Sequence, residues 1–297
     1  MKATMSDRTF ELVNHVLLLL FIGMILFPLL FVLSASVSDP TLVNSGKVWI
    51  WPRGITFEGY KRIFQNNEIW LGYLNTIVYT VIGTVLHLIV LLPCAYALSR
   101  RELAGKKLIL WYFLLTMMIG GGLIPTYLVV RDLGMVNSMW AIVIPGVVGA
   151  WDILVSRTFF QQNVPDPLVE AAKVDGSSYF HIFFRIALPL SLPIIAVMSL
   201  FHGVGLWNQY FNALIYLNHD SLYPLQLVLR KILVAQEMSS ENMANSSIQA
   251  EALAAQARIA SILKYGVIVV STAPLLAVYP FLQRFFLKGV LIGSIKE

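Results

Sequence analysis

The chain has 297 residues, of which 58% are hydrophobic and 12% are charged, and its mean hydropathy is +0.74. Soluble domains carry about 25% charged residues, so this chain lacks the polar surface that a water-soluble protein of its length needs. The net charge of +5 lies in termini and loops that flank apolar stretches, a distribution that argues against a nucleic-acid-binding patch. Composition therefore predicts an all-α integral membrane protein surrounded by membrane lipid.

Six stretches meet the requirement of about 20 mostly apolar residues for a membrane-spanning helix. They cover residues 15–33, 75–98, 108–130, 138–155, 186–217 and 264–282. Glycines 120–122 and Pro125 predict a kink in the third stretch, and the polar run Trp207–Asn212 predicts a bend or an interruption in the fifth. Small residues at 34–36 imitate a signal-peptide cleavage site, but the preceding apolar run is too long for a signal, so we expect a retained helix.

Six spans place both termini on one side of the membrane, and the basic residues indicate which side. The N-terminus, the 99–107 loop, the 156–185 loop and the C-terminal tail hold 12 basic and seven acidic residues, and therefore the whole net charge of +5. Loops rich in Lys and Arg stay in the cytoplasm. We therefore expect a multi-pass membrane protein with both termini cytoplasmic, in which residues 1–297 form a single transmembrane domain.

The most informative segment of the chain lies between the fourth and fifth predicted spans, at Val164–Pro193. Asp166 is expected to cap a helix that has Pro167 at its first position. That helix should run to Asp175, after which Gly176 can take the left-handed conformation that ends a helix. The segment therefore predicts a short helix parallel to the membrane, followed by a tight turn.

One face of this predicted helix is shallow. Leu168, Ala171 and Ala172 share it by their spacing, and the two alanines allow another surface to approach closely. Ser177 is expected to cap a second helix that leads to Pro189. The alternative is a capped surface helix that has no partner.

This elbow resembles the EAA loop of ABC importer permeases. The family pattern combines Glu-Ala-Ala, a glycine after an acidic residue, and a downstream Ile-x-Leu-Pro. The matching residues are Glu170, Ala171, Ala172, Asp175, Gly176, Ile186, Leu188 and Pro189. Nearly the whole chain is similar to the MalG-like permeases of the carbohydrate-uptake branch (LplC and YtcP type), including Trp207-Asn208 and the ending from Tyr279 to Lys296; Glu297 departs from relatives that end in Gly.

The resemblance implies a type I ABC importer permease fold with six transmembrane helices and a cytoplasmic coupling helix. The chain would be the permease subunit, in the bacterial cytoplasmic (inner) membrane, of an ATP-driven, binding-protein-dependent importer of oligosaccharides. Acidic fragments of alginate or pectin are the specific expectation. Its partners would be a second related permease, two ATPase subunits that bind ATP and Mg, and an extracytoplasmic solute-binding protein. Glu170 would contact the ATPase, Ala171 and Ala172 would form the close-packing surface, and Gly176 the turn beside Asp175.

Polar groups inside the predicted spans are costly and usually functional. For Asp152 two interpretations are open: contact with the pore or a sugar, and a hydrogen bond or ion pair between helices. His87 is expected to be a neutral hydrogen-bond partner between helices. Asn208, Gln209 and Tyr210 can contact a sugar, or can belong to an interfacial aromatic belt.

Residues 236–258 form a polar insert on the predicted outer side, for which contact with the binding protein and a solvated loop are both open. The sequence has no phosphate-binding loop and its five histidines lack metal-ligand spacing, so we expect no bound cofactor, no metal and no catalytic activity in this chain. The rival function is a secondary transporter or channel for a small polar solute. A third class, a membrane-embedded enzyme, would need a cluster of acid–base or metal-binding residues inside the membrane, which this sequence lacks.

Overall fold

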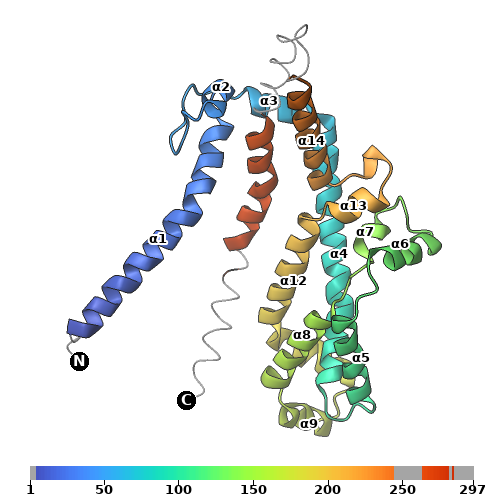
Figure 1. Ribbon diagram of the computed structural model, residues 1–297. Helices are drawn as coiled ribbons and strands as arrows, with labels where there is room; N and C mark the ends of the chain where they lie inside the picture. The colour runs from blue at the N-terminus through green and yellow to red at the C-terminus, as the bar shows by residue number, and fades with distance from the viewer. Residues whose placement is uncertain (1–4, 244–262, 281–282, 284–297) are drawn as a thin grey trace. The chain divides into compact units, whose positions relative to one another are not determined.

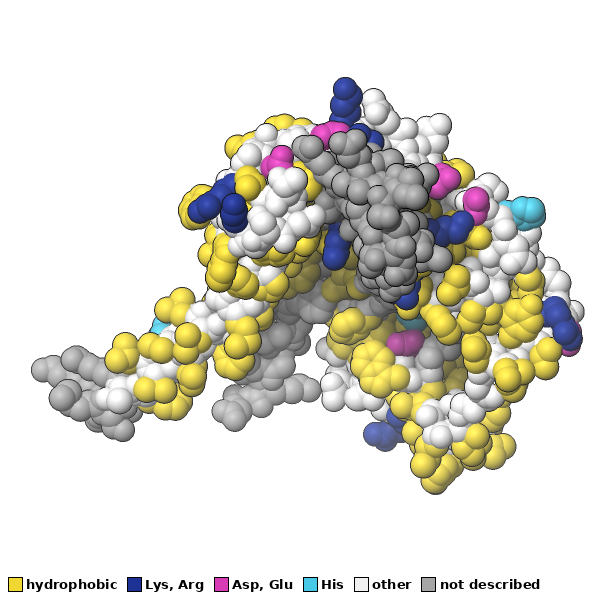
Figure 2. Space-filling model, turned by 45° about the horizontal axis from the view of Figure 1, so that its top comes forward, with side chains coloured by type: hydrophobic (Ala, Val, Ile, Leu, Met, Phe, Trp, Pro, Cys, Tyr) yellow, Lys and Arg dark blue, Asp and Glu magenta, His cyan; other side chains and the backbone are white. Residues whose placement is uncertain are grey.

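The computed structural model describes residues 5–243, 263–280 and 283, and these residues form helices and turns without a strand (Figure 1). They fall into two compact units, the described parts of 1–69 with 229–273, here called unit 1, and of 70–228 with 274–297, called unit 2. Hydrophobic side chains cover much of the surface visible in Figure 2. An apolar outer surface is what a helical protein surrounded by lipid requires.

Unit 1 contains α1 (Met5–Ser36), α2 (Pro40–Asn44), α3 (Glu58–Gln65) and most of the helix Leu263–Pro280. The most apolar window of Thr9–Ser36 has no buried residue, which suits a helix that contacts lipid on all sides. A small core of Ala35, Val43 and Val48 packs at its end.

Unit 2 carries the predicted elbow. Its elements are α4 (Asn67–Ser99), α5 (Lys106–Met118), α6 (Leu123–Asp132), α7 (Trp140–Val143), α8 (Ala150–Asn163), α9 (Asp166–Val174), α10 (Tyr179–Ile182), the π-helical turn η1 (Phe183–Ala187), α11 (Leu188–Leu190), α12 (Leu192–Trp207), α13 (Phe211–Tyr216), the 3₁₀ turn η2 (Asp220–Leu222) and the start of α14 (Leu225–Met243). Helix α8 packs against α5 and α12, and α9 lies at the end of the unit (Figure 1).

Three described helices are long and apolar enough to cross a membrane, and they correspond to the first, second and sixth predicted stretches. Two bent helix pairs raise that number to five if each pair is one span. In the third stretch, α5 and α6 meet at 117°, and the predicted kink is therefore a sharp break. Gly122 permits it, because its φ of +83° is a conformation that side chains with a Cβ rarely adopt.

The fourth predicted stretch, 138–155, differs most from the structure. It forms the short helix α7, an irregular turn, and then α8, which continues to Asn163. Pro145 has no N–H to donate and Gly146 has a φ of +74°, so the helix cannot continue through them. The fifth stretch is interrupted between α12 and α13 as expected, and it also bends by 76° between Leu190 and Leu192.

Candidate functional site

The elbow forms the predicted helix and turn. Helix α9 has Pro167 in its first turn, and Gly176 has a φ of +81°, which confirms the left-handed turn. The Gly176 N–H donates to the Lys173 carbonyl at 2.9 Å, and the Ser177 N–H donates to the Ala172 carbonyl at 3.0 Å. These two bonds are the glycine-terminated helix end that satisfies carbonyls left open by the last turn.

The predictions that Asp166 and Ser177 cap the two helices of the elbow were both wrong. Pro165 occupies the N-cap position of α9, without a side-chain hydrogen bond to the helix. The Asp166 carboxylate is instead paired with Arg100 at 3.3 Å and Arg101 at 2.9 Å. Ser178, one residue after the predicted Ser177, caps α10 by accepting a hydrogen bond from the His181 N–H.

The two alanines of the motif lie on different sides of α9. Ala172 is buried with Val169 in a core cluster that includes Phe160 of α8 and Tyr96 of α4. Glu170 and Ala171 are exposed. The outward face of the elbow is therefore formed by Glu170, Ala171 and their exposed neighbours. Ala172 instead packs α9 against the rest of unit 2.

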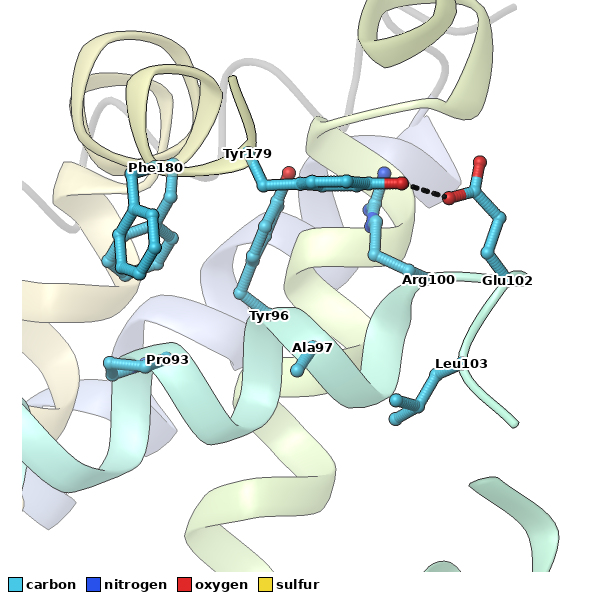
Figure 3. Close-up of a pocket in the computed structure, with 9 residues that line it drawn as sticks. Pro93, Tyr96, Ala97, Arg100, Glu102, Leu103, Tyr179 and Phe180 are labelled. Atoms are coloured by element: carbon cyan, nitrogen blue, oxygen red, sulfur yellow. Dashed lines mark hydrogen bonds between the residues drawn. The ribbon is translucent and has the colours of Figure 1, made fainter. Parts of the chain in front are cut away.

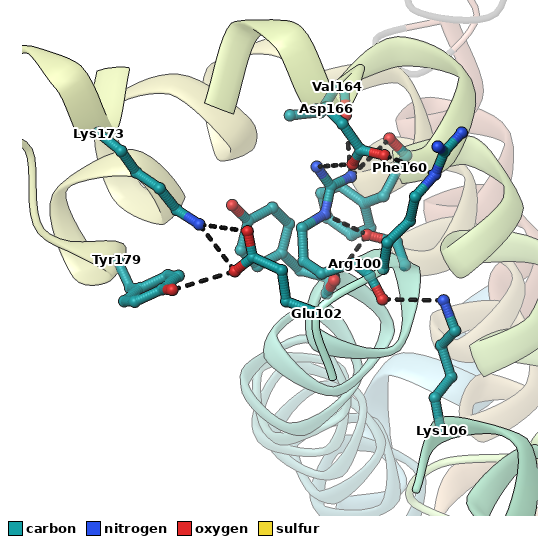
Figure 4. A network of polar contacts seen from close by, with 11 residues as sticks. Arg100, Glu102, Lys106, Phe160, Val164, Asp166, Lys173 and Tyr179 are labelled. Atoms are coloured by element: carbon teal, nitrogen blue, oxygen red, sulfur yellow. Dashed lines mark hydrogen bonds and ion pairs between the residues drawn. The ribbon is translucent and has the colours of Figure 1, made fainter. Parts of the chain in front are cut away.

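A polar network joins the elbow to the end of α4 (Figure 4). The Arg100 guanidinium donates to the Val164 carbonyl at 2.8 Å and the Phe160 carbonyl at 3.4 Å, at the C-terminal end of α8. It also pairs with Asp166 in the first turn of α9. A cation at a helix C-terminus and an anion at a helix N-terminus are both favourable, so Arg100 stabilises the joint between the two helices.

A second contact of this network involves Glu102. Its carboxylate accepts hydrogen bonds from Lys173 Nζ at 2.6 and 2.7 Å and from the Tyr179 hydroxyl at 3.0 Å. The Lys173 hydrogen bond, with the one from Tyr179, lowers the pKa of Glu102 below its ordinary value of 4.5, and the same bond raises the pKa of Lys173 above 10.5. In the sequence, this basic loop indicated only the orientation of the chain, and its role in holding α9 was not predicted.

Replacing Arg100 by Met is expected to destabilise the protein by about 1–3 kcal/mol, because carbonyl groups and a carboxylate lose a partly buried hydrogen-bond donor. The Arg100 side chain is 12% exposed, whereas that of Arg101 is 88% exposed. Arg101→Met is therefore the matched control, with an expected loss of about 0–1 kcal/mol. Unfolding of both purified variants in detergent measures the difference, and equal losses would contradict the assigned role of Arg100.

The pair of Glu102 and Lys173 should make stability depend on pH. Because the pKa of Glu102 is lower in the folded protein, its contribution is present above the unfolded value and is lost as pH falls through the folded value. Because the pKa of Lys173 is raised, its contribution is present below the unfolded value and is lost as pH rises through the folded one.

We expect the thermal midpoint of the natural chain to fall more on acidification below pH 4.5 than that of Glu102→Gln. Glu58→Gln, which removes an exposed ion pair within α3, is the control, because that ion pair joins two residues of the same helix. A difference between the natural chain and Glu102→Gln that does not change with pH would contradict this prediction.

A mainly apolar cavity of about 380 Å³ lies beside this network, between α4, the following loop and α10 (Figure 3). Tyr96, Tyr179 and Phe180 face it. Its walls are thus the same elements that the Glu102 contacts hold together.

A second cavity, of about 350 Å³, brings together two of the four predicted substrate-path residues. Asp152 and Gln209 line it, together with His202 of α12. Asp152 Oδ2 also accepts a hydrogen bond from the Gly149 N–H at 2.9 Å, so this side chain caps α8 rather than pairing two helices. The structure leaves Asn208 and Tyr210 outside this cavity, and the Asn208 amide donates to the Val204 carbonyl of its own helix at 3.0 Å.

The buried His87 and the partly buried His202 lie together in unit 2. Their rings stack with centroids 4.1 Å apart, and His87 Nδ1 lies 2.6 Å from the Val147 carbonyl. The partner of His87 is thus a loop carbonyl between α7 and α8, not a second helix. His202 was not among the predicted site residues, although an ionisable residue inside an apolar stretch is a signal that could have identified it.

The long apolar helices and the bent helix pairs define a class of protein, the helical membrane proteins. The chain belongs to the family of binding-protein-dependent transport system inner membrane components, whose model matches residues 69–292. This result confirms the resemblance stated from the EAA pattern. Protein LplC of Bacillus subtilis is 37% identical over 100% of this chain and 98% of its own length.

Two further proteins extend the comparison. The polygalacturonan/rhamnogalacturonan transport system permease protein YtcP of Bacillus subtilis is 38% identical over 98% of this chain and 100% of its own length. A solved chain from a bacterial ABC transporter involved in the import of the acidic polysaccharide alginate has a TM-score of 0.84 and 33% identity, covering 95% of this chain and 98% of that chain. The all-α permease fold is therefore the fold of this chain.

Proposed function

We propose that this chain is a permease subunit of an ATP-driven importer of acidic oligosaccharides. The family is defined by dependence on a binding protein, and similar chains belong to systems for polygalacturonan/rhamnogalacturonan and for alginate. Its partners would be a second related permease, two ATPase subunits that bind ATP and Mg, and an extracytoplasmic solute-binding protein. Both termini would lie in the cytoplasm.

The observation that carries the coupling proposal is the two-sided construction of the elbow. Its inner side is held by Ala172 and by the contacts of Arg100 and Glu102. Its outer side leaves Glu170 and Ala171 exposed. A rigidly held helix with a shallow exposed face can carry movement of a docked ATPase into α4 and α12, as rigid-body transitions require.

The 236–258 insert is a further candidate contact for the binding protein. Its first residues belong to α14, which ends at Met243, and residues 244–258 lie outside the described part of the chain. Most of the C-terminal ending that carried the resemblance, 284–296, also lies outside it.

Uptake by the whole complex in proteoliposomes tests the proposed function. With binding protein, labelled trigalacturonate and enclosed ATP, we expect accumulation that stops when a non-hydrolysable ATP analogue replaces ATP. An imposed proton or sodium gradient without ATP should give no accumulation. Accumulation driven by such a gradient alone would instead support the rival secondary transporter.

A further inference from the structure

The cavity beside His202 has features of a ligand site. It lies within unit 2, where the turn before α8 and the second half of α12 meet, and its volume of about 350 Å³ is within the range of about 300–1,000 Å³ for small-molecule sites. Its walls combine the polar side chains of Asp152, His202 and Gln209 with the ring of Phe201. Polar groups among apolar helices are costly and are usually functional.

Two of these side chains hold a polar atom that lacks a hydrogen bond. His202 Nε2 and Gln209 Oε1 are buried and have no partner within the described residues. Leaving such an atom unsatisfied costs about 1–3 kcal/mol. Both residues line the cavity, and a ligand bound there is a candidate partner for these two atoms.

The chemistry of the wall selects the ligand class. The Asp152 carboxylate accepts hydrogen bonds, the Gln209 amide accepts and donates, and an imidazole does either according to its tautomer. A sugar hydroxyl both donates and accepts, so it satisfies all three. A uronate carboxylate only accepts, and it would be repelled by Asp152.

Phe201 supplies an apolar surface for a sugar ring. Its side chain is 55% exposed and lines the same cavity. An aromatic ring offers an apolar surface to the C–H face of a sugar ring, while hydrogen-bonding groups contact its edge. The wall thus provides both kinds of contact for one sugar unit.

We infer that this cavity binds the hydroxyl edge of one sugar unit of the transported oligosaccharide, through His202, Gln209 and Asp152. The inference rests on the proposed function and adds His202 to the residues expected from sequence. The part of an acidic sugar that binds here is its hydroxyl groups, and its carboxylates point away from this cavity.

The test compares His202→Phe and Gln209→Leu with the natural chain in the reconstituted complex, at saturating trigalacturonate-loaded binding protein. Phe preserves the ring that stacks on His87, and Leu preserves most of the volume of Gln. We expect binding-protein-stimulated ATP hydrolysis to persist and the sugar imported per ATP to fall by about fivefold or more, as loss of about 1 kcal/mol or more of binding implies. His202→Gln, which keeps a hydrogen-bonding group, should recover part of the uptake.

Thr84→Val is the matched control, because the Thr84 hydroxyl is also buried without a partner in the described residues but does not line the cavity. It should leave the imported sugar per ATP unchanged. Fully methyl-esterified trigalacturonate should show the same loss with His202→Phe as the free acid, since hydroxyl contacts do not depend on the carboxylates.

Three results would overturn the inference. If the His202 and Gln209 variants import as well as the natural chain, the cavity holds only water. If the loss is confined to the free acid, the cavity binds carboxylates. If the natural chain itself imports neither form, the proposed function fails and the inference fails with it.

Discussion

Reversing the charge of Glu170, by Glu170→Lys, is expected to reduce the amount of ATPase that co-purifies with the permease by about tenfold or more. Glu170 is exposed on the outward side of α9, next to a network that holds the helix in place. Loss of one partner of a desolvated charge pair costs about 2–5 kcal/mol at an interface, and about 1.4 kcal/mol is tenfold in affinity. Transport by the reconstituted complex should fall with it.

Ala171→Trp should have the same effect for a different reason. Ala171 is exposed, so an indole there stays in solvent without disturbing the core, but it fills the space that a close-packed partner needs. Ala172→Trp is not an equivalent test, because Ala172 is buried and a large side chain would strain the protein itself.

Asp132→Lys is the matched control for charge. Asp132 ends α6, which lies at the other end of unit 2 from α9 (Figure 1), and the substitution changes the net charge by the same amount. It should leave ATPase co-purification unchanged. Variants of Glu170 and Ala171 that reach the membrane and still hold the ATPase would show that α9 is an ordinary surface helix.

Phe160→Ala is expected to destabilise the protein by about 3–5 kcal/mol, the usual result of emptying a fully buried aromatic site. Phe160 has 0% exposure, and its ring packs edge-on against Tyr96, with centroids 5.5 Å apart. It lies in the cluster that contains Ala172 and Ile182, so its loss removes the surface on which both helices of the elbow rest. Thermal or denaturant unfolding of the purified protein in detergent measures the effect.

Phe180→Ala provides the comparison. Phe180 belongs to the same elbow but is 78% exposed, so its removal should change stability by no more than about 0.5 kcal/mol. Similar losses in the two variants would mean that burial in the elbow is not what holds α9 in place.

The location of the elbow and its turn could be predicted from local sequence. Gly176 ends α9 because a left-handed residue is needed there, and that requirement is readable from an acidic residue followed by glycine. The long apolar stretches similarly predicted α1, α4 and the helix Leu263–Pro280, because the thickness of the membrane fixes their length.

The prediction of a fourth spanning helix over residues 138–155 failed for a physical reason. Hydropathy averages over residues and does not register that Pro145 and Gly146 break the helix. Hydropathy also left the role of Asp152 open, whereas the structure shows its carboxylate in the cavity wall and accepting a hydrogen bond from the Gly149 N–H in the first turn of α8.

The sequence by itself determined that this chain is an all-α membrane protein, that it carries a helix–turn elbow, and that the elbow follows the pattern of a permease family. Only the tertiary structure decided which side of α9 faces outward, and which distant residues hold it. Arg100 and Asp166 are 66 residues apart in the chain, and Glu102 and Lys173 are 71 apart. Periodicity records which residues share a face of one helix, but a contact between helices depends on how they pack, and local sequence does not encode that arrangement.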